Sequence, residues 1–192
     1  EVGNPAFGKA DEELFAKLDT VKTENSKLIT FTPTCRVGEV AADSVVLNAI
    51  INTNIKYCTV FGKTWKLHVD EVLKTTEAEN LRMIRDSIEY LRSKGKTVLF
   101  DGEHFFDGYK HNHDYAIEVL RTAASAGADT LVLCDTNGGC FPDDIKKAVR
   151  EVSKLFGVKI GVHVHNDCDM AVANSVTAAL CGCVGMKPTY GR

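Results

Sequence analysis

The segment Phe156-Gly-Val-Lys-Ile160, followed directly by Gly161-Val-His-Val-His-Asn-Asp167, has the pattern of a buried strand whose last residues become polar. Successive side chains of a strand point to opposite faces, so His163 and His165 project to one side while Val164 packs on the other. Two imidazoles side by side at a strand end are a common way to bind a divalent metal. The same pattern fits a pair of surface histidines or hydrogen-bonded core histidines, so both alternatives remain open at this point.

Outward from this segment, strands and helices alternate along the whole chain. Hydrophobic periodicity predicts earlier strands at 27–32, 57–61, 97–100 and 130–134, and helices at 11–22, 41–52, 69–94, 114–126, 142–155 and 171–181. The stretch before the first of these helices has a loop-like sequence. Such strict alternation predicts right-handed βαβ units and a parallel sheet. A doubly wound sheet and a (β/α)8 TIM barrel both satisfy it.

Two observations favour the barrel. No Gly-rich loop follows the first predicted strand, whereas a dinucleotide-binding sheet would need one. Nearly every strand runs into polar residues, namely Arg36, Lys63, Glu103, His104, Asp135, Thr136, Asn137, His163, His165 and Asn166. In a barrel these strand ends converge on one mouth, where the chemistry takes place. Only five strands are clear, and 192 residues fall below the usual barrel size of about 250. We therefore expect an incomplete barrel.

Composition excludes several functional classes. The net charge of −3 and the pI near 6.1 give no sign of a nucleic-acid partner or of a basic membrane-binding surface. Apolar runs are too short to span a bilayer, and no signal peptide opens the chain. Seven scattered cysteines are typical of reduced thiols in the cytoplasm rather than of a disulfide framework. We expect the closely spaced Cys181 and Cys183 to serve in packing.

Three motifs in order resemble one family. Phe100-Asp-Gly-Glu-His-Phe-Phe-Asp-Gly-Tyr-Lys110, Leu133-Cys-Asp-Thr-Asn-Gly-Gly139 and the His-x-His segment with Ala171-Val-Ala-Asn-Ser175 are similar to the 2-isopropylmalate, homocitrate and citramalate synthases. These belong to the metal-dependent TIM-barrel acyltransferase and lyase superfamily. Val60-Phe-Gly-Lys-Thr-Trp65 resembles the citramalate synthase branch most closely.

The resemblance implies a Claisen condensation in which the acetyl group of acetyl-CoA adds to the carbonyl of a 2-oxo acid, after which the thioester is hydrolysed. A divalent cation (Mg, Mn, Co or Zn) would polarise that carbonyl. His163 and His165 match the two histidine ligands of the family. Pyruvate, giving citramalate, is the favoured substrate, and 2-isopropylmalate or homocitrate synthesis is possible.

Further residues receive roles from the same resemblance. Glu103 is assigned to proton handling or substrate positioning, with a salt-bridged structural carboxylate as the alternative. Arg36 would stabilise anionic substrate groups or simply pair with Glu103, and Thr136 would contact the 2-oxo acid carboxylate. Asp135, His104 and Asn166 are also assigned to substrate binding. Alternatively, Asp135 and Asp101 close an inner ring of barrel contacts. His104, like His111 and His113, would then lie in or beside a polar loop in an outer-shell or surface role.

Some features of the family are missing. Nothing matches its first-strand Arg-Asp-Gly, which supplies a metal-binding aspartate and a catalytic arginine. Cys183 to Arg192 keeps only a hint of its Thr-x-Asn-Gly-x-Gly-Glu-Arg segment. We therefore expect residues 1–192 to form a single partial barrel, about strands two to seven of a longer enzyme, without the first strand, the last strand and the C-terminal domains. A homodimer is expected from the family. The alternatives are aldol cleavage of the hydroxymethylglutaryl-CoA lyase kind, or a non-catalytic fragment that acts as a binding or assembly module.

Overall fold

The computed structural model describes residues 1–18, 20, 21 and 23–188. Its centre is a sheet of six strands in chain order, with every neighbouring pair parallel. The strands are β1 (Ile29–Pro33), β2 (Tyr57–Lys63), β3 (Thr97–Glu103), β4 (Thr130–Asp135), β5 (Lys159–Val164) and β6 (Gly185–Pro188). Each crossover therefore moves one strand along the sheet, which is the winding of a (β/α)8 barrel.

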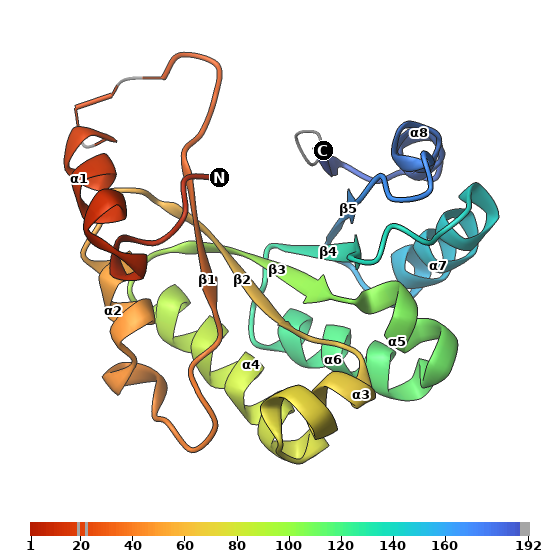
Figure 1. The fold of residues 1–192 in the computed structure, drawn as a ribbon, viewed down its shortest axis with the longest axis horizontal. Helices are drawn as coiled ribbons and strands as arrows, with labels where there is room; N and C mark the ends of the chain where they lie inside the picture. Colours follow the sequence, from red (N-terminus) through yellow and green to blue (C-terminus); the bar gives the residue numbers. More distant parts are fainter. Residues whose placement is uncertain (19, 22, 189–192) are drawn as a thin grey trace.

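The helices pack along one side of this curved sheet, and the other side faces the opening between the two termini (Figure 1). They are α1 (Lys9–Leu18), α2 (Val45–Ile51), α3 (Lys66–His68), α4 (Glu77–Ser93), α5 (Phe105–His111), α6 (His113–Ser125), α7 (Pro142–Leu155) and α8 (Ala171–Leu180). Short 3-10 turns lie at Pro5–Phe7 (η1) and Ala41–Asp43 (η2), and a π-helical turn at Val69–Leu73 (η3).

The hydrophobic core lies between the sheet and these helices. Alternate strand residues point into it, and the fully buried ones include Val60, Val98, Phe100, Leu131, Leu133 and Val162. Burying each such side chain contributes roughly 1.5–3 kcal/mol of transfer free energy. The intervening strand residues face the open, concave side. This second set includes Asp101, Glu103, Cys134 and His163, so these four side chains lie on the side away from the helices.

Two predicted elements differ from the structure in the first half of the chain. Periodicity predicts one helix from 69 to 94, but Lys74 adopts a left-handed conformation (φ 53°) and separates η3 from α4. A new helix then begins, because the Thr76 side chain accepts a hydrogen bond from the Glu79 N–H (3.2 Å). The predicted helix 11–22 lies mostly within α1, which ends at Leu18. Residues 19 and 22 of that prediction lie outside the described part.

The polar loop predicted after the third strand is instead helix α5. Its Phe105, Phe106 and Tyr109 are buried and pack it onto the core. Gly108 allows this close approach, because a Cβ atom there would lie 2.3 Å from the carbonyl oxygen of Thr64. His111 and His113 are helical residues on either side of Asn112 rather than parts of a loop, and both are exposed, which agrees with a surface role.

A sixth strand, β6, follows α8 and pairs with β5 from Gly161–Gly185 to Val164–Pro188. The sequence predicts only five strands, because four residues containing Gly and Pro give no strand signal. The hint of the family segment at 183–192 extends into residues 189–192, which lie outside the described part. At the opposite edge, Val2 N–H donates to Ile29 O (2.9 Å) and Phe31 N–H to Gly3 O (2.8 Å), so the first residues line β1.

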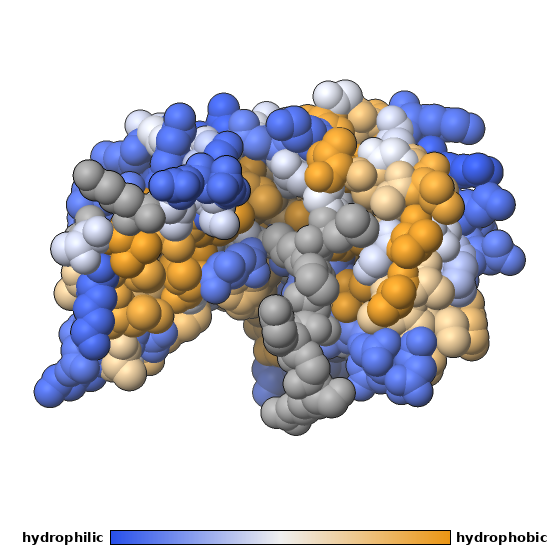
Figure 2. Space-filling view, turned by 90° about the horizontal axis from the view of Figure 1, so that it is seen from above, coloured by the Kyte–Doolittle hydropathy of each residue, from blue (hydrophilic) through white to orange (hydrophobic). Residues whose placement is uncertain are grey.

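Apolar side chains also reach the surface. Figure 2 shows several on the side of the molecule where α8 lies in Figure 1. The large apolar residues that this helix exposes are Val172, Val176 and Leu180, which recur every four residues on one face. Among the described residues, no helix is long and apolar enough to cross a membrane. All seven cysteines lie in the described part, and none of them forms a disulfide there.

Candidate active site at the carboxyl ends of the strands

His163 and His165 lie at the end of β5 and just beyond it, and both are half-buried. Their rings stack with centroids 5.1 Å apart and planes 15° from parallel. The two imidazoles therefore project together, as strand alternation predicts. Burial, followed by the charge of His163, lowers the pKa of His165 below its ordinary value. A neutral imidazole is the form that binds a metal ion.

His163 also belongs to a second group of possible metal ligands. One donor atom each from Asp101, Cys134 and His163 lie within 4.8 Å of one another. The Asp101 Oδ2 is 3.7 Å from the His163 Nδ1, and Asp101 and Cys134 are both buried. These donors come from three neighbouring strands, β3, β4 and β5. A carboxylate, a thiol and an imidazole are ligand types that divalent metals accept, so the residues present fit a cation.

Glu103 lies at the end of β3 and forms an ion pair with Lys63, its register partner on β2. Its carbonyl oxygen accepts hydrogen bonds from the Thr64 N–H (3.2 Å) and hydroxyl (2.6 Å). The pairing with Arg36 that the sequence leaves open does not occur, because the carboxylate is held by Lys63. Glu103 remains half-buried at the edge of the open face.

Thr136 and His104 lie together at the ends of β4 and β3. The His104 N–H donates to the Thr136 Oγ1 (2.9 Å), and the His104 Nδ1 lies 2.9 Å from the Asp107 carboxylate. Asn137 also donates to this carboxylate (3.1 Å). His104 adopts a left-handed backbone (φ 56°), which is uncommon for a residue other than glycine and typical of functional sites.

The ring of His104 belongs to an aromatic cluster beside the mouth. It meets the His68 ring edge-on at 4.3 Å between centroids, and Trp65 packs against both. His68 Nδ1 is buried and makes no hydrogen bond with the described residues. Burial, reinforced by His104, lowers the pKa of His68. The His104 ring is thus held by Trp65, His68 and Asp107. These contacts fit a residue that supports the site from behind as well as one that contacts the substrate.

Asp135 is buried, and its carboxylate is occupied by its own loop. Gly139 N–H donates to its Oδ1 (3.2 Å) and Cys140 N–H to its Oδ2 (3.1 Å). Asn166 caps the start of α8, because its Oδ1 accepts from the Ala171 N–H (3.0 Å). These contacts support structural roles for Asp135 and Asn166. The assignment of both residues to substrate binding stays a prediction.

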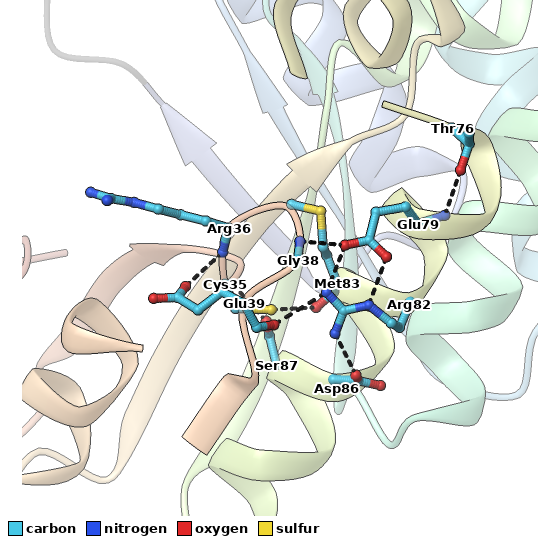
Figure 3. Close-up of polar contacts among 10 residues, drawn as sticks. All are labelled: Cys35, Arg36, Gly38, Glu39, Thr76, Glu79, Arg82, Met83, Asp86 and Ser87. Carbon is cyan, nitrogen blue, oxygen red and sulfur yellow. Dashed lines mark hydrogen bonds and ion pairs between the residues drawn. The ribbon is translucent and has the colours of Figure 1, made fainter. Parts of the chain in front are cut away.

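Arg36 lies on the loop after β1, which α4 holds through the contacts drawn in Figure 3. The loop N–H groups of Cys35 and Gly38 donate to Ser87 Oγ (2.9 Å) and Glu79 Oε1 (2.7 Å), respectively. The Arg36 N–H donates to Glu39 Oε2 (2.7 Å). The Arg36 side chain is exposed and extends away from α4 (Figure 3), and its guanidinium pairs with none of the described residues.

Arg82 joins this loop to α4. Its guanidinium binds both Glu79 oxygens (2.7 Å each) and Asp86 (2.8 Å), and it donates to the carbonyl oxygen of Glu39 (3.2 Å). Bidentate pairing of this kind has a defined geometry as well as strength. The backbone that carries Arg36 is therefore fixed, while its charged group remains available.

Sequence reasoning missed two residues of this site as functional candidates. Asp101 and Cys134 precede Glu103 and Thr136 by two positions, so strand alternation alone places each pair on one face. The sequence therefore contained the signal that each pair shares a face. It did not contain the distance between the strands that carry Asp101 and Cys134. The catalytic roles of Glu103 and Arg36 likewise stay predictions.

Comparison with known proteins identifies the family. The profile of the HMGL-like family matches residues 1–189. The chain belongs to the HMGL-like family. Its α/β fold as an incomplete TIM barrel is therefore confirmed, as is the resemblance to the synthases. The HMGL-like family is metal-dependent, which agrees with the group of donors on β3, β4 and β5.

Curated relatives of this HMGL-like chain include three (R)-citramalate synthases. The enzyme of Sulfolobus acidocaldarius is 42% identical over 95% of this chain and 35% of its own length. The enzyme of Aquifex aeolicus is 43% identical over 95% of this chain and 35% of its own length. The enzyme of Synechocystis is 41% identical over 100% of this chain and 37% of its own length. The chain thus spans little more than a third of the length of these relatives.

Among solved structures, the HMG-CoA lyase of Bacillus subtilis superposes with a TM-score of 0.77, covering 95% of this chain and 60% of the lyase. The sequence identity is 18%, so this likeness concerns the fold alone. The carboxyl transferase domain of Rhizobium etli pyruvate carboxylase matches 83% of the chain and 26% of its own, with a TM-score of 0.62 and 17% identity. The same barrel framework therefore carries different chemistries.

Proposed function

We propose that the protein is an acyltransferase that condenses acetyl-CoA with a 2-oxo acid, and that pyruvate is converted to citramalate. The observation that carries this proposal is the level of identity. It is 41–43% to the three (R)-citramalate synthases over at least 95% of the chain. It is 32% over 74% to a homocitrate synthase of Methanothermobacter thermautotrophicus, and 33% over 71% to a probable 2-isopropylmalate synthase of Methanopyrus kandleri.

In the overall reaction, the acetyl methyl carbon of acetyl-CoA loses a proton and bonds to the ketone carbon of pyruvate. Water then cleaves the thioester, which releases citramalate and coenzyme A. His163 and His165, with Asp101 and Cys134 beside them, would hold a divalent cation (Mg, Mn, Co or Zn). Such an ion supplies Lewis acidity toward the 2-oxo and carboxylate oxygens.

Other residues would bind the substrate and move its protons. The Thr136 hydroxyl already accepts a hydrogen bond from the His104 N–H, so its own proton is available to donate to the substrate carboxylate. Glu103 would exchange a proton with the substrate, and Lys63 keeps its carboxylate in place at the edge of the open face. Arg36 would receive an anionic group of either substrate, because its guanidinium pairs with none of the described residues.

The test is the release of coenzyme A from acetyl-CoA by the full-length protein. Pyruvate, 2-oxoisovalerate and 2-oxoglutarate are compared, with and without a chelator, and with chromatographic detection because the protein has seven thiols. Chelator-sensitive release with pyruvate is expected. Release with another 2-oxo acid would change the substrate, and cleavage of hydroxymethylglutaryl-CoA instead would establish a lyase. No turnover of either kind by metal-loaded protein would leave a non-catalytic role.

Two controls sharpen this assay. Glu103→Gln keeps the size of the side chain but removes its ability to accept a proton, so kcat should fall by about a hundredfold or more. Asp114→Asn changes an exposed carboxylate at the start of α6, and it should leave turnover unchanged. We also propose a homodimer, supported by the family resemblance, and a location in the cytoplasm, supported by the lack of disulfides among the described cysteines. Light scattering of the full-length protein tests the oligomeric state, and fractionation of the native cells tests the location.

A further inference from the structure

Asn174 is a polar residue on the buried face of α8. Its side chain is fully buried, and it shares this face with Ala178, one turn further along the helix. The opposite face carries the exposed Val172 and Val176. Asparagine is a weaker helix former than the alanines around it, and it favours the ends of helices over their interiors. Helix formation therefore does not explain why an asparagine occupies this position.

The amide of Asn174 contacts the loop that follows β4. Its Nδ2 donates a hydrogen bond to the carbonyl oxygen of Cys140 (2.8 Å), which lies 34 residues earlier in the chain. A carbonyl oxygen only accepts, so the nitrogen of the amide must face it. The Asn174 Oδ1 is buried and accepts a hydrogen bond from none of the described residues. A buried polar atom without a partner lowers stability, so packing alone would favour an apolar side chain of similar size.

The hydrogen bond from Asn174 holds the far end of this loop. At the near end, the Asp135 carbonyl oxygen accepts a hydrogen bond from the His165 N–H (3.3 Å), and Thr136 follows directly. At the far end, the Cys140 N–H donates to the Asp135 carboxylate (3.1 Å), while the Cys140 carbonyl oxygen accepts from Asn174. Cys140 thus connects Asn174 to the residue that precedes Thr136.

We infer that Asn174 is a positioning residue for the 2-oxo acid: by holding Cys140, it fixes the loop after β4 and with it the direction of the Thr136 hydroxyl. This inference rests on the proposed function, in which that hydroxyl donates to the substrate carboxylate. Because Asn174 is fully buried, it acts through the loop and not by touching the substrate. Hydrogen bonds weaken steeply with distance and angle, so a small displacement of the loop weakens substrate binding.

Steady-state kinetics of the full-length protein test this inference. Asn174→Leu keeps the size of the side chain and removes the donor, so the KM for pyruvate should rise about tenfold, as for one lost hydrogen bond. The KM for acetyl-CoA should not change. Val176→Thr, on the exposed face of the same helix, is the matched control and should leave both KM values unchanged. If Asn174→Leu does not fold, Asn174→Ala removes the same amide without adding volume and should show the same change.

Two further measurements separate positioning from a general loss of structure. Thr136→Val removes the hydroxyl, and in that background Asn174→Leu should raise the KM for pyruvate no further, because both changes act on one contact. Hydrogen exchange reports on the loop without turnover. The Gly139 and Cys140 amides, which donate to Asp135, should exchange about tenfold faster in Asn174→Leu than in the native protein.

Three kinetic outcomes would overturn the inference: an unchanged KM for pyruvate in Asn174→Leu, equal rises in the KM values of both substrates, or additive effects of Asn174→Leu and Thr136→Val. These outcomes are distinguishable from a failure of the proposed function. If the native protein releases no coenzyme A, the synthase assignment fails and hydrogen exchange decides alone. Faster exchange in Asn174→Leu would then support the hold of Asn174 on the loop, and unchanged exchange would overturn it.

Discussion

Asp101 on β3 reaches across β4 to His163 on β5, and its Oδ2 lies 3.7 Å from the His163 Nδ1. In a flat sheet two strands separated by a third are about 9.5 Å apart. The two side chains therefore span the width of β4 on the concave face, as inward-pointing side chains do in the interior of a barrel. The contact also leaves the other ring nitrogen of His163 available for the site.

The contact between Asp101 and His163 predicts an effect on metal affinity. Asp101→Asn removes the negative charge but keeps the size of the side chain, so Zn²⁺ should bind about 10–100-fold more weakly. Calorimetric titration of the full-length protein measures this. Asp107→Asn is the matched control, because Asp107 lies against His104 rather than in the group of donors. Equal affinities in Asp101→Asn and the native protein would contradict a role for Asp101 at the metal.

Asp135 should act mainly on stability. Asp135→Ala leaves the Gly139 N–H and the buried Cys140 N–H without their acceptor, and hydrogen bonds to a charged group contribute about 1.5–3 kcal/mol each. Because only the Cys140 N–H is shielded from water, we expect the free energy of unfolding in urea to fall by about 2–4 kcal/mol. Glu118→Ala, which removes an exposed carboxylate, should change it by less than about 0.5 kcal/mol. A raised KM for the 2-oxo acid at unchanged stability would instead support substrate binding by Asp135.

Gly138 and Gly139 are adjacent but should tolerate alanine differently. Gly138 has a φ of +62°, and a Cβ there would lie 2.5 Å from Asp167 Oδ2 and 2.9 Å from Asp167 N. Gly138→Ala should therefore destabilise the protein by about 1–3 kcal/mol and disturb the loops after β4 and β5. A Cβ on Gly139 meets no atom within 4 Å, so Gly139→Ala is the matched control. Thermal unfolding of both variants checks this, and similar melting temperatures would count against the contact with Asp167.

The pairing of Glu79 with Arg82 predicts a dependence on pH. The Arg82 guanidinium and the Gly38 N–H lower the pKa of Glu79 from 4.5 to about 2. Its contribution to stability is therefore present above pH 4.5 and is lost as the pH falls from 4.5 toward 2. In Arg82→Ala the urea midpoint should fall less steeply over this range. Arg85→Ala removes an exposed arginine of the same helix, and it should reproduce the native slope. Parallel pH profiles for all three proteins would show that Glu79 titrates elsewhere.

Arg36 should affect substrate binding without affecting stability. Its loop is fixed by main-chain hydrogen bonds, whereas its guanidinium is exposed (Figure 3). Arg36→Ala should raise the KM of its anionic substrate by about tenfold to a hundredfold, the loss expected for one charged hydrogen bond. Arg36→Lys should recover part of this loss, and the unfolding midpoint should not move. A fall in kcat with unchanged KM values for acetyl-CoA and for the 2-oxo acid would contradict this and would indicate that Arg36 acts only in the transition state.

Local patterns predicted much of the fold. Helices α6 and α7 and strands β2 to β5 lie where periodicity and helix-ending glycines place them. The break before α4 also had a local signal, since Thr76 and Glu79 have the spacing of a capping box, but the continuing apolar period hid it. Helix α5 was missed because it is only seven residues long, which is too short for the apolar residues to repeat at helical spacing.

The sequence by itself determined that His163 and His165 share a face, because strand alternation is a property of adjacent residues. It also determined the family, through motifs that each lie on one strand and its following loop. Only the tertiary structure decided which charges meet. Lys63 pairs with Glu103, Asp135 turns into its own loop, and Asp101, Cys134 and His163 converge. Such contacts depend on the register of separate strands and on the curvature of the sheet. Both are set by the packing of the whole sheet against the helices.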